Sequence, residues 1–271
     1  MKRCHVLCRF VVVLCLLLAT TGAYAQGPQD DYTPVPWQAG KDVVWVPTEQ
    51  ELADVMLNIA QVTSSDYVID LGSGDGRIVI AAAKRGATAL GIEYNEDLVE
   101  FARRAAKEER VSARARFEKA DIFQYDFSKA TVITMFLLPE INLRLRPIIL
   151  DMKPGTRVVS NSFDMGDWKP DQTVDLAEDA ISSSYTTALL WIVPAKVNGL
   201  WKFGDGQISF EQEFQHVTGV MTLAGQRMEL TGKLNGSTIK FFAGGRNYTG
   251  TVSGNTISGT HDGGGSWSAV R

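Results

Sequence analysis

The sequence predicts two domains: an α/β domain with a largely parallel sheet, followed by a small antiparallel all-β domain. With 271 residues, of which 45% are hydrophobic, the chain can bury one substantial core and a smaller second one. From Tyr67 to Pro194, short apolar runs alternate with amphipathic stretches, a pattern typical of a parallel sheet with helices on both faces. After Pro194 the sequence is rich in Gly, Thr and Ser with alternating apolar residues, which indicates strands.

The first 25 residues have the features of a secretory signal peptide. Lys2, Arg3 and Arg9 precede a short apolar run, and Ala23-Tyr24-Ala25 supplies small residues for cleavage before Gln26. The alternative is an uncleaved membrane anchor, although the apolar run is well short of the roughly 20 residues that span a bilayer. We therefore expect a secreted or periplasmic protein with no stable membrane span after cleavage.

Cysteine content and charge restrict the chemistry of the mature chain. Cys4, Cys8 and Cys15 all lie in the leader, so no thiol would remain for a disulfide or a thiolate metal site. The whole chain has 27 basic and 31 acidic residues, and losing three basic ones changes its formal charge from −4 to −7. Because phosphate binding needs basic patches, this charge argues against a nucleic-acid partner.

The α/β domain is expected to span residues 43–194, after a flexible Pro-, Gly- and Asp-rich leader at 26–42, and the all-β domain residues 195–271. Thr48 can cap a first helix, and Glu51 three residues later completes a capping box. Five apolar runs predict the parallel strands: Tyr67–Leu71, Ala87–Ile92, Arg114–Glu118, Thr131–Phe136 and Arg157–Ser160. Thr173–Leu176 and Tyr185–Val193 are too close for a helical crossover, so they predict an antiparallel hairpin at one edge.

The all-β domain contains an internal repeat. Leu230–Ile239 matches Tyr248–Ile257 eighteen residues later, and each copy reads as strand, tight turn and strand. Asn235-Gly236 is a strong hairpin signal. We expect a small meander or barrel, whose aromatic residues form either a core or a sugar- or peptide-binding face. Their strand-like spacing favours the core.

A glycine-rich run, Asp70-Leu71-Gly72-Ser73-Gly74-Asp75-Gly76-Arg77, joins a predicted strand to a helix-like run from Ile78 to Lys84. Its glycines let the backbone turn tightly and approach a ligand, and the helix start offers free N–H groups. Dinucleotide loops hold a pyrophosphate, which Asp70 and Asp75 would repel. The acids suit a cofactor with cationic groups, such as S-adenosylmethionine. A Gly-rich turn without a ligand is the alternative.

Two further acids lie where strands end. Glu93 ends the second predicted strand and can accept hydrogen bonds from ribose hydroxyls. Asp121 follows the third strand and is placed for an adenine amino group, with the Ile122 backbone at the ring. Either acid alone would be an ordinary loop carboxylate, but both fall at carboxyl ends of strands, where open α/β sheets bind ligands.

Residues from about Val43 to Pro194 resemble the class I, seven-strand S-adenosylmethionine-dependent methyltransferases, through the loop Asp70–Arg77. More narrowly, they resemble the archaeal and mitochondrial protein-lysine methyltransferases. The segments that carry this resemblance are Trp45-Val46-Pro47-Thr48, Phe136-Leu137-Leu138-Pro139, Asn142-Leu143-Arg144-Leu145-Arg146-Pro147 and Lys153-Pro154-Gly155-Thr156-Arg157-Val158-Val159-Ser160. That group usually has Tyr at the position of Phe136 and His at the position of Asn161.

The resemblance implies a Rossmann-like, doubly wound seven-strand sheet, no metal, and S-adenosylmethionine as cofactor. It implies a cofactor site formed by Pro47, Thr48, Asp70, Gly72, Ser73, Gly74, Asp75, Gly76, Glu93, Asp121 and Ile122. It also implies an acceptor channel formed by Phe136, Leu137, Leu138 and Pro139, although core packing explains the two leucines equally well. The methyl acceptor would be a protein lysine or a small molecule.

One other class of function stays open. The chain could be a non-catalytic envelope protein that keeps the α/β fold and binds an adenosyl compound. A NAD-dependent enzyme is disfavoured by the loop spacing. A Ser-His hydrolase is disfavoured too, because the histidines of the mature chain, His216 and His261, both fall in the all-β domain.

Overall fold

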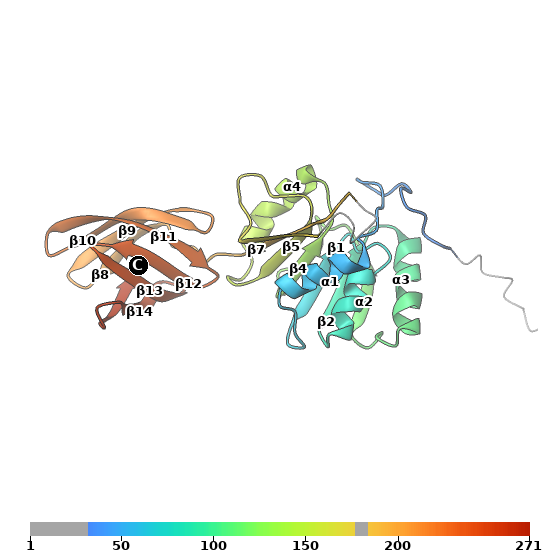
Figure 1. Ribbon diagram of the computed structural model, residues 1–271, viewed down its shortest axis with the longest axis horizontal. Coiled ribbons are helices and arrows are strands. Elements are labelled where there is room, and N and C mark those ends of the chain that lie inside the picture. The colour runs from blue at the N-terminus through green and yellow to red at the C-terminus, as the bar shows by residue number, and fades with distance from the viewer. Residues whose placement is uncertain (1–31, 177–183) are drawn as a thin grey trace, which may run out of the picture. The chain divides into compact units, whose positions relative to one another are not determined.

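The computed structural model describes residues 32–176 and 184–271, which form a seven-stranded mixed sheet with helices and a closed β-barrel (Figure 1). The expected signal peptide at 1–25 and the first part of the leader lie outside the described residues. Within the described ranges, none of the helices is long and apolar enough to cross a membrane.

The sheet has the strand order β3-β2-β1-β4-β5-β7-β6. Its strands are β1 Tyr67–Leu71, β2 Thr88–Glu93, β3 Ala115–Lys119, β4 Val132–Met135, β5 Arg157–Asn161, β6 Gln172–Asp175 and β7 Thr187–Ile192. The pairs from β3 through to β5 are parallel, whereas β7 runs antiparallel to both β5 and β6. The predicted parallel sheet with an antiparallel edge hairpin is therefore confirmed.

In the described part of the chain, four helices cover the two faces of the sheet: α1 Gln50–Ile59, α2 Arg77–Lys84, α3 Glu96–Glu108 and α4 Pro139–Leu150. Because successive strand residues point to opposite faces, Val68 joins the core beneath α1, α2 and α3, and Ile69 joins the core beneath α4. Both cores are fully buried, so the sheet is covered on each side as the sequence predicts.

The predicted cap of the first helix is wrong. Helix α1 begins at Gln50, and its N-cap is Glu49, which makes no side-chain capping bond. The hydroxyl of Thr48 instead accepts a hydrogen bond of 3.1 Å from the Asn161 side chain. Thr48 is buried against the end of β5, and this position takes its oxygen away from the free N–H groups of the helix.

The C-terminal strands close into an antiparallel barrel, in which each strand pairs with its sequence neighbour and β15 pairs with β8. The strands are β8 Gly199–Phe203, β9 Gly206–Glu213, β10 His216–Leu223, β11 Gln226–Asn235, β12 Thr238–Ala243, β13 Arg246–Ser253, β14 Thr256–His261 and β15 Ser266–Val270. The turns of the internal repeat carry Gly236 and Gly254, each with φ of 56°. The prediction of an aromatic core is confirmed for Trp201, Phe203, Phe210, Phe241, Tyr248 and Trp267, which are buried in the barrel core. It is wrong for Phe242, which is 49% exposed, and for Phe214, which packs against the core beneath α4.

Candidate active site

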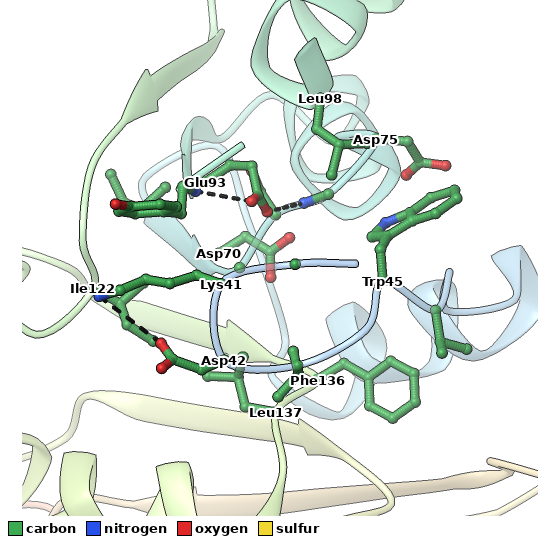
Figure 2. Close-up of a pocket in the computed structure, with 18 of the residues that line it drawn as sticks. Lys41, Asp42, Trp45, Asp70, Asp75, Glu93, Leu98, Ile122, Phe136 and Leu137 are labelled. Carbon is green, nitrogen blue, oxygen red and sulfur yellow. Dashed lines mark hydrogen bonds and ion pairs between the residues drawn. The ribbon is translucent and has the colours of Figure 1, made fainter. Parts of the chain in front are cut away.

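A pocket lies at the carboxyl ends of β1, β2 and β4. Its walls come from the glycine loop, from the segments that follow these strands, and from residues 40–48 (Figure 2). The acids Asp70, Asp75 and Glu93 and the apolar side chains Phe136 and Leu137 surround the same space. Of the residues predicted to bind the cofactor, Pro47, Thr48, Asp70, Gly72, Ser73, Gly74, Asp75, Glu93, Asp121 and Ile122 all line the pocket.

The glycine loop is shaped by close packing as well as by backbone angles. Gly74 has φ of 53°, and a Cβ atom there would lie 2.3 Å from the indole nitrogen of Trp45. Gly76, the remaining predicted cofactor residue, is the N-cap of α2 and does not line the pocket. A Cβ atom at Gly76 would lie 2.6 Å from the ring of Phe117, so this glycine is required for packing of the helix start.

Asp70 is the second-last residue of β1 and is only 3% exposed. The hydroxyl of Thr134 on β4 donates a hydrogen bond of 2.6 Å to its carboxylate. Burial is the main reason that the pKa of Asp70 is raised to about 7; the nearby charges of Asp75 and Glu93 add to the rise, and the hydrogen bond from Thr134 opposes it. Among the described residues no cationic side chain forms an ion pair with Asp70, so a cationic ligand would stabilise its charged form.

Glu93 joins the end of β2 to the glycine loop. One carboxylate oxygen accepts a hydrogen bond of 3.0 Å from the Gly74 backbone N–H. The other accepts hydrogen bonds of 2.8 Å and 2.9 Å from the N–H groups of Tyr94 and Asn95. Three backbone donors therefore fix the carboxylate at the pocket wall, at the position expected to face a ribose.

Three hydrogen bonds hold the Asp121 carboxylate at the pocket, the longest of them one of 3.3 Å from Gln124 Nε2. The carboxylate also accepts a hydrogen bond of 2.9 Å from the Phe123 backbone N–H and one of 2.6 Å from Lys41 Nζ. The hydrogen bond from Lys41 is the main reason that the pKa of Asp121 is lowered. Sequence reasoning missed Lys41, because a single lysine in a segment without periodicity gives no local signal. The residue lies within 26–42, the part of the chain assigned to a flexible leader.

Asp75 forms an ion pair with Arg77 within the glycine loop. Arg77 Nε lies 3.0 Å from both oxygens of Asp75, and Arg77 Nη2 lies 2.5 Å from one of them. Arg77 Nη1 also donates a hydrogen bond of 2.8 Å to the Thr48 carbonyl. This hydrogen bond ties Thr48 to the start of α2.

Of the four residues predicted to form the acceptor channel, two line the pocket. Phe136 and Leu137 line the pocket, and Leu137 is also part of the core beneath α4. Leu138 and Pro139 do not line it, because the chain turns there into α4. Leu138 is the N-cap of that helix and is 41% exposed, and Pro139 is its first residue.

Comparisons with known proteins agree on methyl transfer. Residues 70–172 match the family model described as the ANTKMT methyltransferase domain. A protein-lysine N-methyltransferase from Saccharolobus islandicus is 41% identical over 139 residues, which cover 50% of this chain and 86% of that protein. The adenine nucleotide translocase lysine N-methyltransferase of Mus musculus is 34% identical over 116 residues, which cover 42% of this chain and about half (51%) of that protein.

A solved structure gives a second acceptor class. It is described as an RNA methyltransferase from Salinibacter ruber in complex with S-adenosyl-L-homocysteine. It is 47% identical, covers 56% of this chain and 96% of that one, and has a TM-score of 0.52. Methyl transfer is thus common to these relatives, whereas their names differ in the acceptor.

The pocket fits a polar, cationic cofactor. The Ser73 hydroxyl is buried in the glycine loop, and no hydrogen-bond partner is found for it within the described part of the chain. This hydroxyl is packed toward β2, since a Cβ atom on Gly91 would lie 2.4 Å from Ser73 Oγ. The uncompensated carboxylate of Asp70 is therefore the group that suits the charged end of S-adenosylmethionine.

Proposed function

The chain belongs to the S-adenosylmethionine-dependent methyltransferase family that includes the archaeal protein-lysine N-methyltransferase, and on that premise we propose that it methylates lysine side chains of proteins. The observation that carries the proposal is the pocket at the strand ends. There, carboxylates from β1 and β2 lie opposite the apolar wall of Phe136 and Leu137. Such a site is charged where a cationic cofactor binds and apolar where an amine would arrive.

The residues of the chain have separate tasks in this reaction. When bound, the cofactor supplies an electrophilic methyl group on a sulfonium. Asp70 offers the charge that a cationic group requires, and Glu93 and Asp121 offer acceptors for hydroxyl and amino groups. Holding donor and acceptor in line is the main catalytic task, and good alignment can contribute several kcal/mol.

The apolar wall also favours the neutral form of the acceptor amine. A lysine amine attacks only when neutral, and its usual pKa leaves it charged in water. Desolvation at the Leu137 side of the wall disfavours the charged form and lowers the pKa of an amine that reaches the methyl group. The proton then passes to solvent before transfer, so no basic side chain is needed in the wall.

A methyl-labelling experiment tests the proposal. The full chain is incubated with radiolabelled S-adenosylmethionine and a cell extract, and label is measured in protein, RNA and small-molecule fractions. We expect label in protein that acid hydrolysis releases as methyl-lysine. Label confined to RNA, as the Salinibacter ruber name would suggest, or to small molecules overturns the lysine proposal. Cofactor binding without any transfer indicates the non-catalytic alternative.

We also propose that residues 1–25 direct export of the protein. The basic start, the short apolar run and the small residues before Gln26 support this proposal. Mass spectrometry of the protein purified from its native host should find a mature N-terminus at Gln26. A retained Met1 in protein from the soluble cell fraction would contradict export.

A further inference from the structure

Three aromatic side chains cluster beside the apolar wall of the pocket. The ring centroids of Phe136 and Tyr185 lie 5.0 Å apart, those of Phe163 and Tyr185 5.7 Å, and those of Phe136 and Phe163 5.9 Å. All three side chains are partly buried, and none belongs to either hydrophobic core of the sheet. They form a separate aromatic cluster at the edge of the protein interior.

The topology brings these rings to the edge of the sheet where the pocket lies. Strands β4 and β5 are parallel and in register up to Met135 and Ser160, so Phe136 and Phe163 follow neighbouring strand ends. Strand β7 runs antiparallel to β5, which places Tyr185, just before β7, at the same edge. Phe136 itself lines the pocket, so the ring cluster begins where the cofactor pocket ends.

A buried amide lies among these strand ends. Asn161, the last residue of β5, is fully buried, and its Nδ2 donates a hydrogen bond to the Thr48 hydroxyl at the pocket wall. No hydrogen-bond partner for its Oδ1 is present in residues 32–176 and 184–271. An unpaired buried acceptor is costly unless a ligand supplies a donor.

The backbone after Asn161 is held in place by α4. The amide of Asn142 donates hydrogen bonds of 3.1 Å and 3.2 Å to the carbonyls of Phe163 and Asp164. These bonds fix the backbone that carries the Phe163 ring. The ring cluster is therefore anchored to the same helix that begins after the apolar wall.

We propose that Phe136, Phe163 and Tyr185, together with Asn161, form the subsite for the acceptor amine, and that it binds alkylammonium groups. This inference rests on the proposed lysine methylation. The three centroids form a nearly equilateral triangle, and a cation about 4 Å from its plane lies about 5 Å from each centroid. That distance is within the range of cation–π attraction for rings that turn a face to the cation; the planes of Phe136 and Phe163 are 20° apart and Tyr185 is tilted against both. Asn161 Oδ1 can accept a hydrogen bond from an amine N–H.

Binding of methylated lysine tests the subsite without any catalytic turnover. The full chain, saturated with S-adenosylhomocysteine, is titrated calorimetrically with the tripeptide Gly-trimethyllysine-Gly and with its neutral isostere, in which carbon replaces the ammonium nitrogen. We expect the cation to bind roughly five- to thirtyfold more tightly than the isostere. Equal affinity for the two tripeptides, or no binding of either, overturns the proposal.

Substitutions test whether the aromatic rings cause the preference for the cationic tripeptide over its neutral isostere. Phe163→Leu and Tyr185→Leu should each remove most of the preference for the cation and leave affinity for S-adenosylhomocysteine unchanged, which shows that the domain is folded. Phe242→Leu is the matched control, because Phe242 is 49% exposed on the barrel. A preference that survives both ring substitutions overturns the proposal.

Asn161 is tested with a substrate that keeps an N–H group. The tripeptide Gly-dimethyllysine-Gly can donate a hydrogen bond, whereas its trimethylated counterpart cannot. Asn161→Leu should weaken binding of the dimethylated tripeptide several-fold and leave the trimethylated one unchanged. Equal losses for both would assign Asn161 a purely structural role. If the subsite binds cations but no protein is methylated in the labelling experiment, the proposed function fails while the subsite stands.

Discussion

Replacing Asp70 by Asn removes a buried charge without changing the shape of the side chain. Burial raises the pKa of Asp70 to about 7, compared with 3.8 for a free aspartate. A difference of about three pKa units corresponds to about 4 kcal/mol where the group is ionised. At about pH 8 and without cofactor, we expect Asp70→Asn to be more stable than the wild type by up to this amount, about 4 kcal/mol.

The pH dependence gives the sign of the effect. Between about pH 4 and about pH 7, the folded protein keeps a proton on Asp70 that the unfolded chain releases. The free energy of unfolding of the wild type should therefore fall through this window and level off above it. Asp70→Asn should lack this component of the fall. Denaturant unfolding followed by helical circular dichroism measures it, because the helices of the described residues all belong to the α/β domain.

Asp66 provides a control of opposite sign, because it is also buried and directly precedes β1. Burial raises its pKa, but hydrogen bonds from Thr63, Thr131 and Arg157 outweigh this effect and lower the pKa overall. Asp66→Asn should therefore destabilise the protein at about pH 8. If Asp70→Asn is no more stable than the wild type there, and wild-type stability does not fall between about pH 4 and about pH 7, the electrostatic argument is refuted.

Three further predictions concern the cofactor. Affinity for S-adenosylmethionine should rise with pH up to about 7, since a cation favours ionised Asp70, and calorimetry below that pH should detect proton release. Lys41→Met should strengthen cofactor binding a few-fold, because Lys41 competes for the Asp121 carboxylate; weaker binding would show that Lys41 contacts the cofactor instead. Gly74→Ala should weaken binding and destabilise the fold by about 1–3 kcal/mol, since φ is 53° and Trp45 blocks a Cβ; unchanged thermal unfolding would contradict this.

Features that depend on local sequence were predictable. The strand Tyr67–Leu71 matches the structure at both ends, because an apolar run followed by glycine specifies its own boundaries. The hairpins of the barrel follow from the turn residues of the repeat. The closure of β15 onto β8 joins the two ends of the domain, and no local pattern distinguishes this barrel from an open meander.

Features that depend on partners far away in the sequence could not be predicted from it. The hydroxyl of Thr48 has the chemistry of a helix cap, but Asn161 supplies a partner that only the sheet brings near. Lys41 becomes part of the pocket only because Asp121 lies beside it in the fold. Leu138 and Pro139 were assigned to a channel wall, whereas the proline starts α4 and turns the backbone away.

The carboxylates of the pocket differ in how their charge is compensated. This difference identifies Asp70 as the carboxylate that a cationic ligand would stabilise most. Backbone N–H groups bind Glu93, Arg77 pairs with Asp75, and Lys41 pairs with Asp121. Asp42, also at the pocket, is 44% exposed, and its carboxylate lies 3.9 Å from Lys41 Nζ. Among the described residues, Asp70 has a neutral hydroxyl as its donor and no cationic partner, although it is the most deeply buried of the pocket's carboxylates. A ligand without positive charge would leave that cost in place, so the pocket favours a cationic methyl donor over a neutral nucleoside.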